Sequence, residues 1–414
     1  MRVTAVLLFI LSISAAAFAQ DRVLWDEQFD AAGGGDIARA IAVTGKTVVV
    51  TGGTSTAAGT EMAVRSYNKK TGKVRWSDST PLVNGVQTAV YATKVAGVVY
   101  TAGYASNGVG SDIAVHAYDA NTGAHLWQDV LDRGRDDFPR DLAASQAAVV
   151  VVGYGGNTPG RNVDLLVRAY HPVTGQVLWD DQIDTDGQSD DAFRVALTDT
   201  QVIVGGMTSI GTTRTLILRA YDVATGARLW DVRETDFSPT ALTVRGGRVF
   251  VGGSSATLAA TRAYKATTGK LLWQDQGSSG TVRDMQVRAG QLVEVGNFGV
   301  RLMDVKSGDA AWESPSAASE FLSMVELGAS AIYIAGSSGN EFASESVVRA
   351  YDYSGNAIWE DRAYRSSDTQ PHALTLSGRK LFVAGHVTKG DGVNFDFFIR
   401  AYDVRDLEQP NDGE

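Results

Sequence analysis

The chain has 414 residues and a net charge of −10, which argues against non-specific binding to nucleic acid or anionic lipid. It contains no cysteine, which excludes disulfides, catalytic thiols and thiolate-bound metals. The 45 glycines against 8 prolines, together with abundant Val and Thr, indicate many short strands joined by tight turns.

The first residues have the pattern of a cleavable secretory signal. Arg2 supplies a positive charge, Val6 to Ile13 form a short apolar core, and Ala17-Phe18-Ala19 place small residues before Gln20. The apolar core is too short to span a membrane, and no later window is long enough. We therefore expect residues 1–19 to be a signal peptide, the protein to be periplasmic or secreted, and no segment to span a membrane.

The tryptophans that follow reveal a sequence repeat. Seven of them recur at intervals between 39 and 52 residues: Trp76, Trp127, Trp179, Trp230, Trp273, Trp312 and Trp359. Each closes a phrase such as VRAYHPVTGQVLW, and an eighth phrase begins at Ile399 without a tryptophan. Repeats of this length with strong β character are typical of propeller blades.

Four strand patterns recur within each repeat. In the first repeat they cover residues 39–43, 47–51, 62–67 and 73–76, and a Thr-Gly turn separates the last two. A recurrent glycine in that turn fits a hairpin that needs positive φ. The pattern predicts an all-β protein with four-stranded blades, in which the first strand of each blade is the inner one.

The missing eighth tryptophan lies near the N-terminus. Arg22-Val23-Leu24-Trp25 matches the end of an outer strand, and no repeat precedes it. We therefore predict an eight-bladed β-propeller whose ring is closed by this N-terminal strand joining the C-terminal blade, which removes two free sheet edges. Residues 20–406 would form one propeller, and the polar segment 407–414 would be a C-terminal tail.

The phrase Ala-Tyr-Asp-x-x-Thr-Gly-x-x-Leu-Trp resembles the repeat of the pyrroloquinoline-quinone (PQQ) dehydrogenases and their non-catalytic, protein-binding relatives. The resemblance implies that one tryptophan per blade docks flat between neighbouring blades. These tryptophans would be Trp25, Trp76, Trp127, Trp179, Trp230, Trp273, Trp312 and Trp359. It also implies PQQ and calcium as cofactors, but the chain lacks the vicinal disulfide and the long insertions of the enzymes.

The starts of several inner strands carry basic residues. Arg39, Arg140, Arg194 and Arg283 are expected at equivalent positions, with His372 close to the same place in the last repeat. Because inner strands line the channel of a propeller, these side chains could form an anion-binding collar. The alternative is that each arginine pairs with an aspartate three residues earlier (Asp36, Asp137 or Asp191) and fixes the loop entering its blade.

Two further charged groups have a functional and a structural interpretation. Asp184, Asp186 and Asp190 offer the hard oxygen ligands that calcium prefers, although a solvated acidic turn is the alternative. A basic residue also recurs in the third strands: Arg65, His116, Arg168, Arg219, Arg262, Arg301, Arg349 and Arg400. We expect this second group to be structural and to meet turn carboxylates such as those of Asp222, Asp304 and Asp403.

Chain direction places the outer-to-inner loops and the second-to-third-strand loops on one face. These loops are acidic and variable in length, whereas the opposite face carries the uniform Thr-Gly turns. Variable loops on a rigid scaffold are where recognition usually occurs. The sequence thus favours an exported, monomeric, non-enzymatic propeller that binds a protein or an extended envelope ligand on this variable face, with a PQQ- or metal-dependent oxidoreductase as the alternative.

Overall fold

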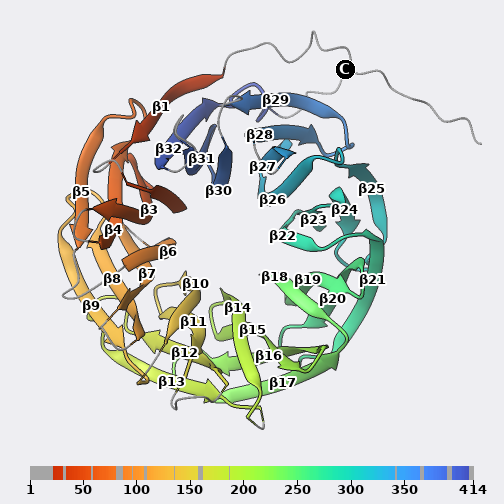
Figure 1. The fold of residues 1–414 in the computed structure, drawn as a ribbon. Coiled ribbons are helices and arrows are strands. Elements are labelled where there is room, and N and C mark those ends of the chain that lie inside the picture. Colours follow the sequence, from red (N-terminus) through yellow and green to blue (C-terminus); the bar gives the residue numbers. More distant parts are fainter. Residues whose placement is uncertain are drawn as a thin grey trace, which may run out of the picture.

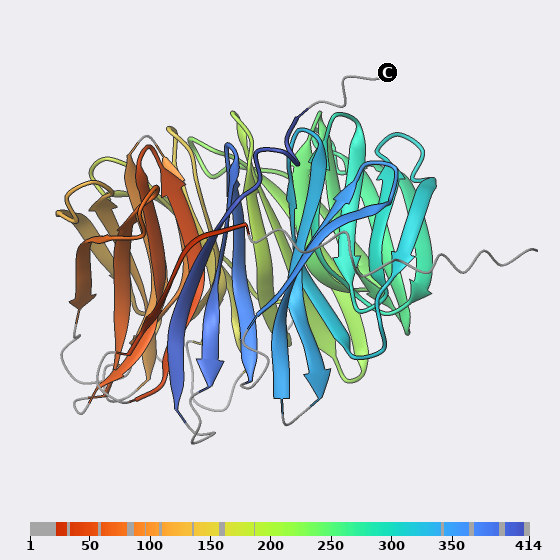
Figure 2. The ribbon, with the colours of Figure 1, turned by 90° about the horizontal axis from the view of Figure 1, so that it is seen from above.

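The computed structural model describes residues 22–30, 34–56, 59–80, 87–95, 97–106, 110–134, 136–156, 162–185, 187–340, 343–363, 368–388 and 394–409. These residues contain 32 strands, and no helix among them is long and apolar enough to cross a membrane. The strands form eight four-stranded antiparallel sheets around a central axis (Figures 1 and 2). The predicted eight-bladed propeller is confirmed.

The first four blades run from the channel outward in chain order. Blade 1 contains β2 (Asp36–Thr44), β3 (Thr47–Thr56), β4 (Gly59–Asn68) and β5 (Val74–Thr80). Blade 2 contains β6 (Gln87–Val95), β7 (Val98–Ser106), β8 (Ser111–Asp119) and β9 (His125–Leu131). Blade 3 contains β10 (Phe138–Ala144), β11 (Val149–Gly155), β12 (Asp164–Tyr170) and β13 (Val177–Ile183). Blade 4 contains β14 (Ser189–Leu197), β15 (Gln201–Ile210), β16 (Thr213–Asp222) and β17 (Arg228–Thr235).

The next three blades repeat this order, and the last blade differs. Blade 5 contains β18 (Ser238–Arg245), β19 (Arg248–Ser255), β20 (Leu258–Lys265) and β21 (Leu271–Ser279). Blade 6 contains β22 (Val282–Arg288), β23 (Gln291–Gly296), β24 (Gly299–Asp304) and β25 (Ala310–Pro315). Blade 7 contains β26 (Glu320–Leu327), β27 (Ala331–Asn340), β28 (Ala343–Asp352) and β29 (Ala357–Ala363). Blade 8 contains β30 (Thr369–Ser377), β31 (Lys380–Thr388), β32 (Phe395–Asp403) and, as its outer strand, β1 (Val23–Phe29).

The N-terminal strand closes the ring as predicted. β1 pairs antiparallel with β32, with Trp25 opposite Ala401. The Arg22 guanidinium also binds the Asp406 carboxylate, with Nη2 to Oδ2 at 2.8 Å. Both ends of the described chain therefore stabilise blade 8 (Figure 1).

The segment expected to be a tail begins against the propeller. Glu408 is buried, and its carboxylate accepts hydrogen bonds from the Tyr333 hydroxyl at 2.7 Å and the Ala329 amide at 2.6 Å. Leu407 packs against the hydrophobic core between blades 7 and 8. These two residues are thus part of the packed structure, and residues 410–414 lie outside the described residues.

The tryptophans pack between blades. Trp76 of blade 1, for example, donates a hydrogen bond from Nε1 to the Ala120 carbonyl of blade 2 at 3.1 Å, and its ring stacks on Tyr118 at 6.1 Å between centroids. A Cβ atom on Gly123 would lie only 2.6 Å from this indole, so the turn glycine is required for the close approach as well as for its φ of 77°. The same indole-to-carbonyl bond joins other blades at Trp25, Trp127, Trp179, Trp230, Trp273 and Trp312.

Every inner strand has a β-bulge at one position. The residues at the bulge position, where the register shifts, are Arg39, Val90, Arg140, Phe193, Thr240, Arg283, Ser323 and His372. At the bulge the backbone of the inner strand lies so close to the second strand that only glycine fits there. In blade 5, for example, a Cβ on Gly253 would lie 2.1 Å from the Ser238 carbonyl oxygen. A bulge reorients the side chain at the extra residue, here on the strand that faces the channel.

Candidate functional site at the channel mouth

A cavity of about 650 Å³ lies on the ring axis, between the inner strands of blades 3 to 8. The residues that line it are Arg140, Asp191, Ala192, Phe193, Arg194, Pro239, Thr240, Arg283, Asp284, Phe321, Ser323, Met324, Gln370, Pro371 and His372. Most belong to the first half of their strands. Inner strands begin on the variable face, so the cavity lies at that end of the channel.

The structure brings four of the five collar residues together. Arg140, Arg194, Arg283 and His372 line the cavity, whereas Arg39 is not among its lining residues. The charge of Arg39 nevertheless contributes to lowering the pKa of His372, which places it nearby. The expectation that Arg194 is equivalent to Arg140 and Arg283 is wrong by one residue, because Phe193 occupies the bulge position of blade 4.

Arg140 is neutralised across a blade boundary. Its Nε lies 3.1 Å from each oxygen of Asp191 and its Nη2 lies 2.7 Å from Oδ2, a bidentate pair between β10 and β14. The alternative interpretation expected Arg140 to pair with Asp137, three residues earlier, which is wrong. Asp137 instead accepts the Arg133 amide of its own loop at 2.6 Å.

Two aspartates missed by the sequence analysis lie near Arg194. Asp141 and Asp284 both follow the bulge position, and Arg194 acts on the pKa of each. Burial raises the pKa of Asp284 to about 6 and raises that of Asp141. Each carboxylate also joins two inner strands, because Asp141 accepts the Val195 amide and Asp284 accepts the Val325 amide, both at 2.9 Å.

Arg283 lies beside an aromatic ring. Its guanidinium carbon lies 5.0 Å from the ring centroid of Phe321, a cation–π contact. Its Nε is buried without a hydrogen-bond partner, and within the described chain it forms no ion pair. Phe321 is 45% exposed. The pair therefore offers an uncompensated cation beside an accessible aromatic ring.

His372 faces a second histidine. Its Nε2 lies 2.8 Å from Nδ1 of His386, and the rings stack at 5.0 Å. Burial, with a contribution from Arg39, lowers the pKa of His372 to about 3 and that of His386 to about 4. His372 is thus neutral at ordinary pH and contributes hydrogen-bonding capacity to the cavity rather than charge.

The carboxylates around the cavity do not fit a calcium-bound quinone. Asp191 is held by Arg140 through both of its oxygens. Asp141 and Asp284 each accept two backbone amides, from the residue that follows and from the next blade. Every oxygen of these three carboxylates therefore already accepts a hydrogen bond, and none is left without a donor for the several oxygen contacts that calcium requires.

The candidate metal-binding group in the acidic loop between blades 3 and 4 includes one aspartate that the sequence did not predict. Asp184 and Asp190 lie with Asp164 of β12 in a group whose ligand oxygens are all within 4.8 Å of one another. Asp186, the third residue proposed from the sequence, lies outside the described residues. Asp164 was missed because it comes from the third strand, 20 residues before the loop.

The third-strand arginines bind outer-strand carboxylates. The ion pairs at 2.6–3.1 Å are Arg65–Glu27, Arg168–Asp180, Arg219–Asp231, Arg262–Glu234, Arg301–Asp275, Arg349–Glu360 and Arg400–Asp361. The expectation of turn carboxylates as partners is wrong: Asp222 and Asp304 accept amides of their own turns, and Asp403 pairs with Arg405. His116 contacts His125 at 3.1 Å instead.

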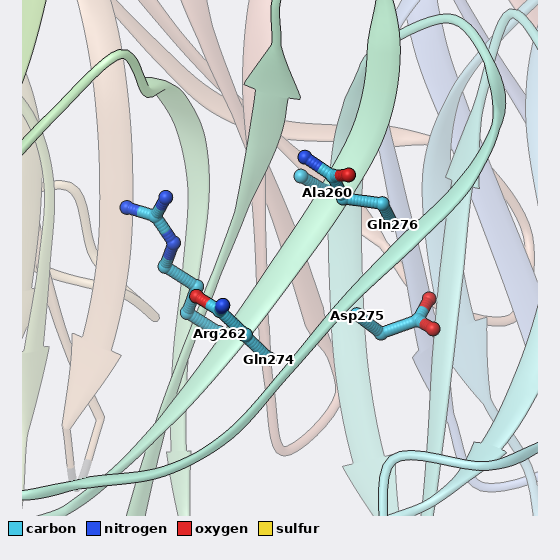
Figure 3. Close-up of a pocket in the computed structure, with 5 residues that line it drawn as sticks. All are labelled: Ala260, Arg262, Gln274, Asp275 and Gln276. Atoms are coloured by element: carbon cyan, nitrogen blue, oxygen red, sulfur yellow. The ribbon is translucent and has the colours of Figure 1, made fainter.

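A smaller pocket of about 280 Å³ lies on the outer part of blade 5. Figure 3 shows Arg262 and Asp275 at this pocket with their charged groups pointing apart. Arg262 pairs with Glu234, and Asp275 pairs with Arg301, each at 2.7 Å. Because both charges are satisfied, this pocket is a weaker candidate than the channel mouth.

Several solved structures share this fold. BamB from Moraxella catarrhalis is 16% identical, with a TM-score of 0.51 over 92% of this chain and 98% of that one. A europium-containing methanol dehydrogenase is 12% identical, with a TM-score of 0.58 over 92% and 93%. Chaetomium thermophilum Sqt1, bound to the N-terminus of the ribosomal protein L10, is 13% identical, with a TM-score of 0.59 over 91% and 98%. At these identities the likeness shows the fold alone.

Family membership is shown by the sequence itself. No curated protein matches the chain. The family described as outer membrane protein assembly factor BamB matches residues 12–215 and 213–370, which is most of the chain. The chain therefore belongs to the BamB family, and its structure is a PQQ-like β-propeller.

Proposed function

We propose that the protein is an exported, non-enzymatic propeller that binds an extended polypeptide segment of a partner protein at the channel mouth on its variable face. The observation that carries this proposal is Arg283, a cation on the cavity wall without an ion pair in the described chain, next to the exposed ring of Phe321. Arginine next to an aromatic ring suits a carboxylate flanked by apolar atoms.

The shape of the cavity supports a chain-like ligand. Six blades contribute to its wall, and the mixture of arginine, neutral histidine, glutamine and aromatic side chains offers both hydrogen bonds and apolar contacts. Asp191 neutralises Arg140, and the charge of Arg194 acts on the carboxylates of Asp141 and Asp284, so Arg283 is the cavity arginine that we take as the anchor for an anionic group. A ligand with one carboxylate and an extended backbone matches this distribution better than a small polyanion.

The relatives support the same class of ligand. The similar propeller Sqt1 is bound to the N-terminus of a ribosomal protein, and the family is that of an outer membrane protein assembly factor. Binding of a polypeptide is thus within the capacity of this fold. No observation at the channel favours the quinoprotein alternative, since its carboxylates do not fit calcium.

Export is part of the proposal. It is supported by the positive, apolar and small-residue pattern in residues 1–19, which lie outside the described residues. N-terminal sequencing of the secreted or periplasmic protein should give Gln20 as the first residue. An intact Met1 in the protein recovered from the cytoplasm would contradict export.

Photo-crosslinking tests the binding site. A photoreactive phenylalanine analogue replaces Phe321, and a matched variant carries it at Val173, which is 76% exposed on a turn of the opposite face. We expect a discrete adduct from position 321 alone. Arg283→Gln should weaken it by roughly tenfold, because hydrogen bonds to a charged group contribute about 1.5–3 kcal/mol. Equal adducts from both positions, or an adduct unaffected by Arg283→Gln, would contradict the proposal.

A further inference from the structure

Acidic residues gather at three junctions between blades. We call these the junction triads: Asp30, Asp36 and Asp396 between blades 8 and 1; Asp112, Asp132 and Asp137 between blades 2 and 3; and Asp164, Asp184 and Asp190 between blades 3 and 4. In each triad the three ligand oxygens lie within 4.8 Å of one another.

The triads are equivalent by register. Asp36, Asp137 and Asp190 each stand three residues before the bulge of their inner strand. The second member comes from the loop that precedes this strand (Asp30, Asp132 or Asp184). The third member lies near the start of the third strand in the preceding blade, four residues before its basic residue (Asp396, Asp112 or Asp164). Each triad thus links two blades on the variable face.

Buried carboxylate oxygens without partners lie in two of these triads. Asp137 is fully buried; its Oδ2 accepts the Arg133 amide, while its Oδ1 has no hydrogen-bond partner. Asp190 is fully buried in the same way; its Oδ2 accepts the Thr185 amide at 2.6 Å, and its Oδ1 forms no hydrogen bond of ordinary geometry, although the Thr208 hydroxyl of β15 lies near this carboxylate. A buried carboxylate oxygen without a partner is costly unless something else binds it.

Asp137, Asp164 and Asp190 form no ion pair with an arginine or lysine in the described chain. The charge of Arg133 acts on the pKa of Asp137, and that of Arg233 acts on the pKa of Asp190. The ion pairs of these two arginines are with other carboxylates, those of Asp180 and Asp231 respectively. Burial, together with Asp112 and Asp132, raises the pKa of Asp137 to about 6. A cation bound between these carboxylates would compensate their negative charge.

Two other junctions have no uncompensated buried carboxylate at the equivalent position. At the position equivalent to Asp190, blade 5 has Phe237, fully buried with the guanidinium carbon of Arg262 at 4.3 Å from its ring. Blade 7 has Glu320, which pairs with Arg349 at 2.8 Å and Arg362 at 2.7 Å. At these two junctions an apolar ring replaces the carboxylate, or two arginines neutralise it. In the triads, the equivalent aspartate lies beside two further carboxylates instead.

We propose that the three junction triads are calcium sites that tie neighbouring blades together on the variable face. Calcium binds carboxylate and carbonyl oxygens at about 2.3–2.6 Å, so that oxygens up to about 4.8 Å apart can share one ion. Asp132 and Asp184 are exposed, which leaves each site open for loop carbonyls or water to complete its coordination. Each ion would connect the third strand of one blade to the inner strand of the next.

Equilibrium dialysis of the full mature protein with radioactive calcium tests the sites after chelator treatment. We expect three ions per chain, and two in Asp132→Asn or in Asp184→Asn; both side chains are exposed, so these substitutions leave the packed core intact. Asp222→Asn, at the half-buried end of β16 on the opposite face, is the control and should still bind three.

The triple variant Asp30→Asn, Asp132→Asn, Asp184→Asn should bind no calcium while its far-ultraviolet circular dichroism remains that of the wild type. The proposal is overturned if the folded wild type binds no calcium at millimolar concentration. It is equally overturned if the triple variant binds as many ions as the wild type. Neither result depends on a ligand at the channel mouth, so the calcium sites and the proposed function are tested separately.

Discussion

Arg140 of blade 3 and Asp191 of blade 4 form a bidentate ion pair across the wall of the channel, with Nη2 to Oδ2 at 2.7 Å. The guanidinium also lies 4.9 Å from the ring of Tyr154. The pair joins two inner strands that are neighbours in the ring but not in one sheet. It therefore links blades at the cavity, as the tryptophans do farther from the axis.

A double-mutant cycle should measure this link. Arg140 and Asp191 are 44% and 31% exposed, so screening by water limits their coupling to about 0.5–1 kcal/mol. We expect Arg140→Gln and Asp191→Asn to show this coupling in urea unfolding, and added salt to reduce it. If the two substitutions lower the free energy of unfolding additively, and added salt does not change this result, the pair does not couple the blades.

Replacement of Trp25 should weaken the pairing of β1 with β32 that closes the ring. Trp25→Ala removes an indole that packs on Gly72 and Tyr67 of blade 1, at a cost of about 3–5 kcal/mol. Trp76→Ala removes the same contact one junction later and is the matched control. Only Trp25→Ala should speed amide exchange in β32, because loss of β1 exposes that edge. Equal exchange in both variants would show that β1 stays paired without its tryptophan.

Arg301 should be the most costly of the third-strand arginines to remove. It pairs with Asp275 and with Glu294, whose side chain is fully buried. Arg301→Met leaves that carboxylate uncompensated, and breaking a buried pair in this way costs about 3–5 kcal/mol. Arg262→Met, where the partner Glu234 is 24% exposed, should cost much less in the same urea unfolding assay. Similar losses in the two variants would contradict the special role of Glu294.

The fold could be predicted from the sequence because its determinants recur. The tryptophan and the turn glycine are in direct contact between blades, as at Trp76 and Gly123, so one physical requirement recurs from repeat to repeat. Closure could be predicted for the same reason, since Trp25 lacked a blade upstream. The repeat therefore contains the information on blade number, strand order and the position of each outer strand.

The candidate sites depend on details that spacing does not reveal. From the sequence, Arg194 was expected to be equivalent to Arg140. The bulges show that the residue equivalent to Arg140 is Phe193, one position earlier. Partners across blades were also missed, because Arg140 and Asp191 are 51 residues apart. Asp164 could have been noticed as an aspartate four residues before the third-strand arginine, but only the register shows that it meets Asp190.

Acidification should destabilise the protein through the pair of His372 and His386. Burial lowers the pKa of His386 to about 4, so between pH 6.5 and pH 4 the unfolded chain binds a proton that the folded chain does not. The free energy of unfolding therefore falls as the pH drops through this window, by about 1.4 kcal/mol per unit of pKa difference at most. His386→Asn should show a smaller fall in urea unfolding from pH 7 to pH 4.

The matched control for this pH dependence is His171→Asn. His171 accepts amides in a turn on the opposite face, where asparagine is well tolerated. We expect this variant to follow the wild type at every pH. If His386→Asn loses as much stability on acidification as the wild type does, protonation of the histidine pair is not the cause.

Glu408 should anchor the C-terminal segment to blade 7. Glu408→Ala leaves the Tyr333 hydroxyl and the Ala329 amide without their acceptor, and an unsatisfied buried polar group costs about 1–3 kcal/mol. Gly328→Ala should have a similar effect from the other side, since a Cβ there would lie 1.8 Å from Glu408 Oε1 and displace the carboxylate. Tyr333→Phe combined with Glu408→Ala removes one unsatisfied group and should recover part of the loss. Unchanged urea unfolding of Glu408→Ala would mean that the segment contributes nothing to the stability of the ring.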